Sequence, residues 1–388
     1  MKKFLAFVMA ASMALSLSAC VGSTPASSTA STTTEATSEA AASTSGSKTD
    51  VAFVTDVGNI DDQSFNQYTW QGVQDFCSAN SLNANYYRPT EDSDAARLEQ
   101  MDNAVNDGAK AVVVAGYLFG SSIAEAQAKY PDVEFLALDV STVDLGDTAP
   151  AENTALITYK EEQAGYLAGY AAVYDGYKEL GFLGGMAVPA VIRYGYGFVQ
   201  GADAAAAELG QNIEINYFYG GQFYGDANIT SRMEGWYSNG TQVVFACGGG
   251  IYTSAVEAAL KNNGYVIGVD VDQNYIGANG VADGTYAYNP FITSAMKGLS
   301  EAVNTALADI DAGSWGDIAG SNGNFGLEDG DYIGLPTDAD SWNFESFTTD
   351  EYEEVKGKIK SGEITVDNSS DDATKPTVSE FTTVNYIQ

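Results

Sequence analysis

The sequence predicts an α/β protein built from two similar lobes, each a doubly wound parallel sheet. The first observation is the run Val51–Val54, which is apolar throughout and typical of a strand buried on both faces of a parallel sheet. The second is that polar residues crowd in directly after it and lead into a helical pattern. The third is that such units repeat to about residue 173 and begin again near residue 180. Two rounds, each near the size of a single domain, predict two lobes.

The expected elements follow this alternation along the chain. In the first round we expect strands at residues 51–54, 83–87, 111–115, 134–138 and 155–158. We expect four helices between them: one from Phe65, one at 93–106, one that ends at 129 and one at 161–173. In the second round we expect strands at 180–183, 213–219, 243–246 and 266–269, and helices at 194–208 and up to 262. Beyond Gly284 we expect a strand at 285–288, a helix at 292–309 that carries Lys297, and a short helix at 351–359.

The chain of 388 residues is long enough for two lobes with substantial cores. We assign residues 50–158 plus about 285–315 to an amino-terminal lobe. Residues 159–284 plus about 316–388 are assigned to a carboxy-terminal lobe.

The segment before the first lobe predicts export and a membrane anchor. Lys2 and Lys3 precede an apolar run too short for a stop-transfer helix, so residues 1–19 are expected to be a signal peptide. Its end, Leu17-Ser18-Ala19-Cys20, resembles a bacterial lipobox, which implies cleavage before Cys20 and a lipid on its thiol. The alternative is a generic signal with an incidental cysteine. Residues 20–49 are mostly Ser, Thr and Ala, a composition typical of a flexible tether.

The charge balance excludes several partners and chemistries. The chain has 17 basic and 52 acidic residues, no His and a formal charge of −35, so its surface repels nucleic acid and anionic lipid. Without His there is no Ser-His-Asp triad and no H-E-x-x-H zinc site. The Asp270-x-Asp272-x-Asn274 spacing lacks the glycine and the final glutamate of a calcium loop. We therefore expect no catalytic residue, metal or cofactor, and no nucleic-acid partner.

The cysteines of the folded part are Cys77 and Cys247. They fall in different expected lobes, so a disulfide between them is not expected. Two small buried thiols are the better interpretation.

Three aspartates follow predicted buried strands directly. Asp56, Asp139 and Asp270 should therefore point toward one crevice at the carboxyl ends of the strands. Carboxylates in such positions suit a ligand with several hydroxyl groups, because they accept charge-assisted hydrogen bonds. The alternative is that each aspartate caps the helix that follows.

Two aromatic residues lie in loops of otherwise small and polar residues. Phe65 and Phe223 come from opposite lobes and could hold a planar heterocycle between them. The alternative is that each ring packs locally under its own loop. The glycine run at residues 248–250 either binds an anion at a helix start or lets the backbone approach a ligand or the other lobe closely. Lys297 either reaches the crevice or lies at the surface.

The run Val54-Thr55-Asp56-Val57-Gly58-Asn59-Ile60-Asp61-Asp62-Gln63-Ser64-Phe65-Asn66-Gln67 resembles the opening signature of the basic membrane protein family. These are nucleoside-binding lipoproteins that serve ABC importers. Further motifs agree in order, at residues 116–120, 159–169, 181–186 and 266–273. The resemblance implies a type I periplasmic-binding-protein fold, with two Rossmann-like lobes joined by three crossovers and a ligand between them.

The resemblance also implies roles for individual residues. Asp56, Asn66 and Phe65 match family residues that contact the base, and Phe223 matches the stacking aromatic of the second lobe. The rest of the expected ligand-binding set is Asp139, Asp270, Gly249 and Lys297, with Ser64, Tyr117 and Asp272 from the same motifs. Two stretches depart from the family pattern, Tyr117-Leu118 and Tyr224-Gly225-Asp226.

The hypothesis from the sequence is a monomeric, lipid-anchored receptor on the extracytoplasmic face of a bacterial cell membrane. It would bind a purine nucleoside and pass it to an ABC transporter permease. One alternative is a receptor of the same fold for a sugar or a signalling molecule. Another is a nucleoside hydrolase, because Asp56 to Asp62 faintly resembles the aspartate cluster of calcium-dependent nucleoside hydrolases, although Val54 replaces its leading aspartate.

Overall fold

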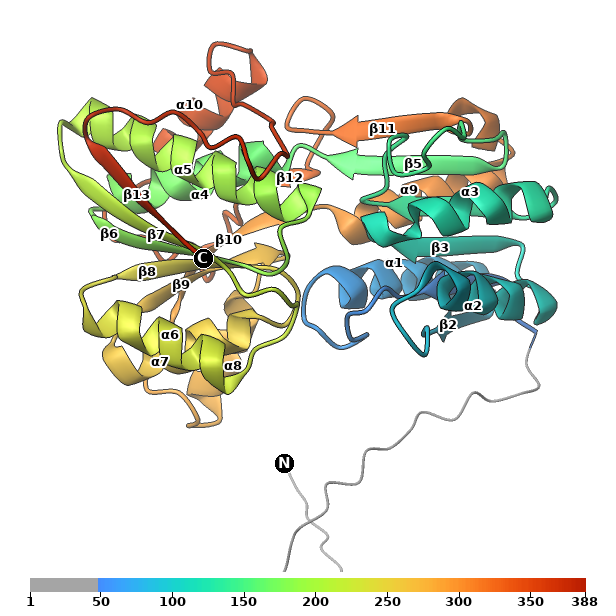
Figure 1. The fold of residues 1–388 in the computed structure, drawn as a ribbon, viewed down its shortest axis with the longest axis horizontal. Coiled ribbons are helices and arrows are strands. Elements are labelled where there is room, and N and C mark those ends of the chain that lie inside the picture. Colours follow the sequence, from blue (N-terminus) through green and yellow to red (C-terminus); the bar gives the residue numbers. More distant parts are fainter. Residues whose placement is uncertain (1–47) are drawn as a thin grey trace, which may run out of the picture. The chain divides into compact units, whose positions relative to one another are not determined.

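The computed structural model describes residues 48–388, which form two lobes around two separate sheets (Figure 1). The predicted signal peptide, Cys20 and nearly all of the predicted tether lie outside the described residues. Within residues 48–388, no helix combines the length and the apolar character needed to cross a membrane. Cys77 and Cys247 are buried free thiols, as expected.

The first lobe is built on a fully parallel sheet in the order β11-β5-β4-β3-β1-β2. Its strands are β1 (Val51–Val54), β2 (Ala84–Tyr87), β3 (Ala111–Ala115), β4 (Glu134–Leu138), β5 (Thr154–Tyr159) and β11 (Ser321–Phe325). Helix α1 (Phe65–Asn80) packs beside α9 (Leu299–Ala312), and α2 (Asp94–Asn106) packs beside α3 (Gly120–Lys129). Every residue of β1 and β3 is buried, which explains why these strands are continuous apolar runs.

The second lobe is built on a sheet in the order β12-β10-β9-β8-β6-β7-β13, in which only β12 runs antiparallel to its neighbour. Its strands are β6 (Glu179–Gly184), β7 (Ile213–Tyr219), β8 (Val243–Cys247), β9 (Tyr265–Asp270), β10 (Phe291–Lys297), β12 (Ile333–Gly334) and β13 (Thr382–Ile387). Its helices are α4 (Glu161–Tyr174), α5 (Pro189–Leu209), α6 (Ala227–Ser238), α7 (Tyr252–Asn262), α8 (Asn274–Ala282) and α10 (Thr349–Lys360). In Figure 1, α4 and α5 lie on one side of this sheet and α6, α7 and α8 on the other.

The chain passes between the lobes three times, after β5, after β10 and after β11. The backbones of these crossovers hold one another. The N–H of Lys160 donates to the carbonyl of Phe325 at 2.8 Å, and the N–H of Gly298 donates to the carbonyl of Tyr332 at 2.8 Å. The predicted architecture of two parallel-sheet lobes is confirmed.

The strand predicted at 285–288 and the helix predicted from 292 are wrong. Residues 291–297 form strand β10, which pairs with β9, and the helix begins only at Leu299. A run that is buried on both faces has no period that distinguishes a strand from a buried helix. This pairing places β10 in the second lobe, whereas α9 and β11 belong to the first, so the second and third crossovers differ from those expected. Helices α6 and α8 and strands β11, β12 and β13 were not expected from the sequence.

Helices α4 and α5 approach each other closely because glycines face the neighbouring backbone. A Cβ at Gly169 of α4 would lie 2.1 Å from the carbonyl oxygen of Phe198, and one at Gly201 of α5 would lie 1.9 Å from that of Tyr166. Such distances leave no room for a methyl group. The glycines at these positions therefore fix the spacing of the two helices whose amino-terminal turns lie beside the crevice between the lobes.

We predict that Gly169→Ala lowers the free energy of unfolding by about 1 to 3 kcal/mol, because the new methyl group overpacks a backbone contact. Gly235→Ala in α6 is the matched control. Nothing lies within 4 Å of a Cβ there, so the better helix propensity of alanine should raise the free energy of unfolding by up to about 1 kcal/mol. Urea unfolding measures both changes. An unaltered stability of Gly169→Ala would contradict the packing argument.

Candidate ligand-binding site between the lobes

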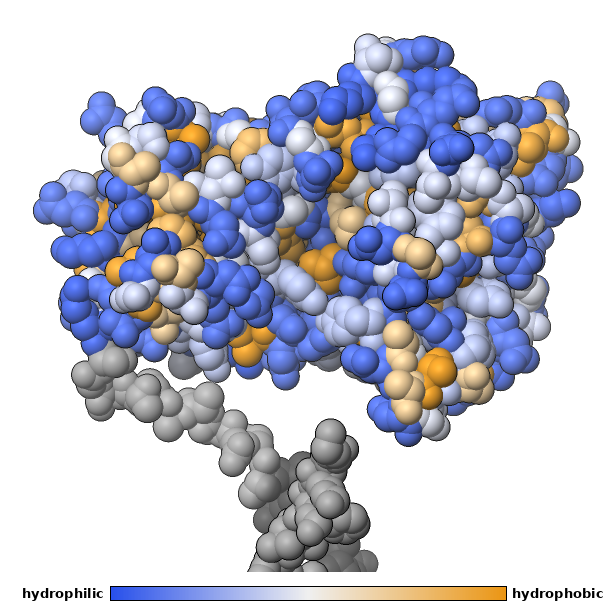
Figure 2. Space-filling view, turned by 180° about the vertical axis from the view of Figure 1, so that it is seen from behind, coloured by the Kyte–Doolittle hydropathy of each residue, from blue (hydrophilic) through white to orange (hydrophobic). Residues whose placement is uncertain are grey.

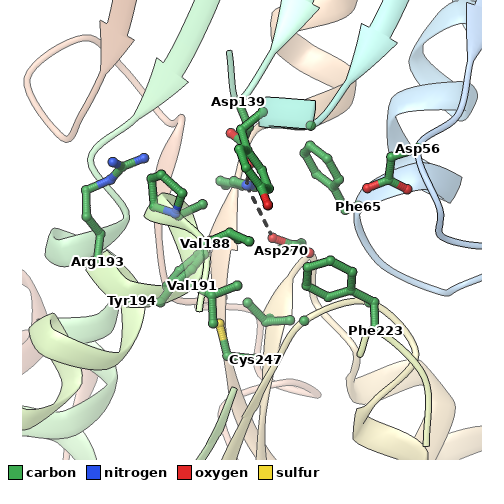
Figure 3. A pocket seen from close by; sticks show the side chains of 18 of the residues that line it. Asp56, Phe65, Asp139, Val188, Val191, Arg193, Tyr194, Phe223, Cys247 and Asp270 are labelled. Carbon is green, nitrogen blue, oxygen red and sulfur yellow. Dashed lines mark hydrogen bonds and ion pairs between the residues drawn. The ribbon is translucent and has the colours of Figure 1, made fainter. Parts of the chain in front are cut away.

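A cavity lies where the carboxyl ends of strands from both sheets meet (Figure 3). The empty space there is about 830 Å³ when the part open to solvent is included. Figure 2 shows apolar side chains at the middle of one face, between two regions dominated by hydrophilic residues. The crevice expected from the strand-loop-helix pattern is present.

Nine of the eleven residues expected to bind ligand line this cavity. They are Asp56, Phe65, Asn66, Tyr117, Asp139, Phe223, Gly249, Asp270 and Lys297. Ser64 and Asp272 do not. Ser64 is buried behind the wall and its hydroxyl donates to the Asp270 carboxylate. Asp272 accepts from the backbone N–H of Asn274 at 3.0 Å and from the Ser341 hydroxyl, so it holds the loop after β9 against the carboxy-terminal segment.

One end of the cavity is formed by the loop between β1 and α1. Oδ1 of Asp56 accepts from the backbone N–H of Gly58 at 2.6 Å and from Nδ2 of Asn66 at 2.9 Å. Asp62 accepts from the backbone N–H groups of Ser64, Asn66 and Gln67 at 2.9 to 3.1 Å, and so caps the start of α1. Burial raises the pKa of Asp56 and raises that of Asp62 to about 6. These bonds fix the two side chains before any ligand arrives.

Asp62 lines the cavity, although it was not in the expected ligand-binding set. The sequence signal for its capping role was present, because an aspartate shortly before a helical pattern is a common cap. Its exposure to the cavity depends on the path of the loop, which the sequence does not reveal.

The centre of the cavity holds one ammonium among three buried carboxylates. Lys297 Nζ lies 2.6 Å from Oδ2 of Asp139, 3.6 Å from Oε1 of Glu161 and 3.7 Å from Oδ1 of Asp270. The lysine is 4% exposed and lies 4.5 Å from the centre of the Phe65 ring. The carboxylates raise its pKa even though burial opposes this, so it stays charged. Burial raises the pKa of Asp139 to about 6 despite the adjacent ammonium.

Several buried polar atoms in the cavity wall have no hydrogen-bond partner within residues 48–388. They are Oδ1 of Asn66, Oδ1 of Asp139 and the hydroxyl of Tyr194. Because buried polar groups are nearly always satisfied, these atoms are available for hydrogen bonds to water or to a polar ligand in the cavity.

The two expected rings lie beside the same cavity, one from each lobe (Figure 3). The glycine loop after β8 positions Phe223: the N–H of Gly250 donates to the Phe223 carbonyl at 2.8 Å. Gly249 has φ 52, and a Cβ there would lie 3.0 Å from the same carbonyl oxygen. The glycines therefore allow a close approach to the Phe223 loop of their own lobe, whereas the approach expected from the sequence was to a ligand or to the other lobe.

Hydrogen bonds outside the cavity also join the lobes. The Gln63 carbonyl accepts from Nε2 of Gln273 at 3.0 Å, and its side-chain oxygen accepts from the Tyr275 hydroxyl. Gln63, Asp139 and Asp270 have φ of 56, 55 and 67, a region that side-chain-bearing residues rarely adopt. All three make contacts between the lobes, so backbone strain is concentrated where the lobes meet.

The wall contributed by Val188 and the first two turns of α5 was not expected from the sequence. Val188, Val191, Arg193 and Tyr194 line the cavity (Figure 3). The helix was expected from residue 194 but begins at Pro189. Proline is favoured at the first helical position, and this signal could have located the turn.

Comparison with known proteins decides the family. Residues 49–370 match the model of the Bmp family, described as ABC transporter substrate-binding protein PnrA-like. The chain belongs to this family. Among curated relatives of this Bmp protein, the CD4+ T-cell-stimulating antigen of Listeria innocua serovar 6a is 30% identical over 329 residues, which is 81% of this chain and 87% of the relative. A Lactococcus lactis protein named ABC transporter nucleoside-binding protein BmpA is 29% identical over 283 residues, 69% of this chain and 76% of the relative.

Solved structures show the same fold for this Bmp protein. An ABC transporter solute-binding protein of Aeropyrum pernix K1 superposes with a TM-score of 0.69 at 22% identity, over 84% of this chain and 95% of that one. An ABC transporter solute-binding protein of Conexibacter woesei superposes with a TM-score of 0.65 at 21% identity, over 82% of this chain and 99% of that one. The family resemblance and the periplasmic-binding-protein fold are both confirmed. As a substrate-binding protein of an ABC transporter, the protein binds a small molecule on the extracytoplasmic side of a membrane and works with a permease.

Asp62 predicts a pH dependence of stability. Its pKa in the folded protein is raised to about 6 from an ordinary 3.8, so folding favours the protonated form. The protonated Asp62 therefore adds to the free energy of unfolding below about pH 4. This contribution, about 3 kcal/mol at most, is lost as the pH rises through 6.

We therefore expect the free energy of unfolding of the wild type to fall relative to that of Asp62→Asn between pH 4 and pH 7, as measured by urea unfolding. Parallel curves for the two proteins over this range would contradict the assignment.

Proposed function

We propose that this protein binds a purine nucleoside in the cavity between its lobes and delivers it to an ABC permease. One observation carries the proposal: Phe65 and Phe223, from opposite lobes, line one cavity together with carboxylates from both. Two rings suit the faces of a planar base, and acidic groups suit a sugar with free hydroxyls. The name of the Lactococcus lactis relative, which is a nucleoside-binding protein, supports the same ligand class.

The base belongs at the end formed by Asp56 and Asn66. A purine presents both donors and acceptors at its edge. The free carboxylate oxygen of Asp56 accepts from ring or amino N–H groups, and the unpartnered Oδ1 of Asn66 offers a second acceptor. Because these side chains are already held by Gly58 and by each other, little entropy is lost when they bind.

The ribose belongs at the centre, near Lys297. Asp139 has one oxygen on the lysine and one without a partner, which can accept from a ribose hydroxyl. Asp270 uses one oxygen for Ser64 and keeps the other 3.7 Å from the lysine. The ammonium can donate to a hydroxyl oxygen that sits between the two carboxylates.

Two further properties belong to this proposal. We infer that a lipid on Cys20 anchors the protein to the outer face of the cell membrane, because the lipobox resemblance implies it. We also infer that the protein acts as a monomer.

Of the alternative functions, a receptor for a sugar would use the same carboxylates but would not need both rings. The hydrolase alternative is not favoured, because the hydrogen bonds of Asp56 and Asp62 show that these residues stabilise a loop and the start of a helix.

Isothermal titration of the purified protein with adenosine, guanosine and inosine tests the ligand class. We expect Phe65→Ala and Phe223→Ala each to weaken binding by more than tenfold, because each removes a stacked ring and its buried area, together worth about 2 kcal/mol or more. Tyr224→Ala is the control, since Tyr224 is 58% exposed and neighbours Phe223.

The absence of heat with every nucleoside would reject the ligand class. Unchanged affinity in the two phenylalanine variants would instead mean that the rings only pack locally.

A further inference from the structure

The first two turns of α5 form an end of the cavity that the proposed base and ribose contacts leave unused. In Figure 3, Arg193 lies on the side opposite Phe65 and Phe223, with Asp139 and Asp270 between them. A nucleoside whose base lies between the rings, and whose ribose lies at Lys297, would direct the far end of its sugar toward this turn. The residues there have no role in the binding described so far.

Arg193 presents unused hydrogen-bond donors at this end. Its Nε donates to Oε2 of Glu161 at 2.6 Å, which fixes the guanidinium. No other hydrogen bond of this side chain is present within residues 48–388, so the two terminal nitrogens, which can only donate, have no acceptor in that part of the chain. The acidic neighbours raise the pKa of Arg193 further, so it is always charged.

The start of α5 adds backbone donors beside Arg193. The helix begins at Pro189 after Val188, whose side chain cannot cap it. The N–H groups of Ala190 and Val191 make no hydrogen bond within the described residues, and both residues line the cavity. The first N–H groups of a helix carry partial positive charge and attract electronegative atoms.

A second, independent observation on the same turn points to a polar ligand. Tyr194 is 2% exposed and lines the cavity, yet its hydroxyl has no partner within residues 48–388. A buried hydroxyl of this kind is normally satisfied. The turn therefore combines unused donors from a side chain, from the backbone and from a phenol.

The charges around this end decide which kind of acceptor fits. The carboxyl groups of Glu161, Glu162 and Asp139 lie near Arg193, and Asp270 faces Lys297, so four acids stand against two cations. Because acids outnumber bases, a phosphate would be repelled by its neighbours. An uncharged oxygen can accept from Arg193 without that cost.

We propose that Arg193 and the start of α5 bind the 5′-hydroxyl oxygen of the nucleoside, so that this turn selects ligands with a free, uncharged 5′ end. The inference rests on the proposed nucleoside function and deepens it. It makes Arg193 a specificity-determining residue: the site reads the sugar at both ends, with Lys297 and its carboxylates at the ring hydroxyls and Arg193 at the 5′ position.

Titration of the wild type with adenosine, 5′-deoxyadenosine and adenosine 5′-monophosphate tests this directly. We expect loss of the 5′ oxygen to weaken binding about tenfold and the phosphate to weaken it at least as much. Arg193→Met should weaken the binding of adenosine about tenfold. The binding of 5′-deoxyadenosine should be equally strong in the variant and in the wild type. Arg232→Met is the control, because Arg232 lies on α6 and packs over the Phe218 ring of β7.

The outcomes separate the two proposals. If no nucleoside binds the wild type, the proposed function fails and this inference fails with it. If adenosine and 5′-deoxyadenosine bind the wild type equally, the 5′ contact is rejected while the nucleoside function stands. Tighter binding of the monophosphate would mean that the turn is a phosphate site. The wild-type titrations decide the matter even if Arg193→Met does not fold.

Discussion

The ion cluster around Lys297 is the interaction on which the rest of the structure depends. Its ammonium lies 2.6 Å from Asp139 of the first lobe and within 3.7 Å of Glu161 and Asp270 of the second. Buried carboxylates are costly without a compensating charge, and removing one partner of a buried pair costs about 3 to 5 kcal/mol. Lys297 thus allows Asp139 of one lobe and Asp270 of the other to be buried near each other, while Glu161 is also paired with Arg193.

This arrangement couples closure of the lobes to the chemistry of the cavity. The same surfaces that meet across the cleft carry the unpartnered acceptors of Asp139 and Asn66, and the rings of Phe65 and Phe223 approach from either side. A ligand that satisfies these groups would contact both lobes at once, and contacts of this kind favour the arrangement in which the lobes lie together. The three crossovers, which hold one another by backbone hydrogen bonds, are the natural hinge.

The sequence predicted much of the fold because the chemistry of its strands is local. Strands 111–115, 134–138 and 213–219 have the predicted bounds, since each is a short apolar or β-rich run bounded by turn residues. Asp56 and Asp139 reach one cavity because parallel strands end at the same edge of a sheet, and Asp270 reaches it from the end of β9 in the second sheet. The two failures have different causes. The run before Lys297 has no period that separates strand from helix, so its pairing with β9 was needed to assign it. The start of α5 carried a sequence signal, Pro189, that was not used.

Small-angle X-ray scattering of Lys297→Met tests the central claim most directly. Without the ammonium, Asp139 of one lobe would face Asp270 of the other with no cation between them, while Glu161 would keep its ion pair with Arg193. We therefore expect the lobes to move apart and the radius of gyration to exceed that of the wild type. Lys261→Met is the control, because Lys261 makes exposed ion pairs with Glu234 and Glu257 within one lobe. A scattering profile of Lys297→Met identical to that of the wild type would contradict the claim that this lysine holds the lobes together.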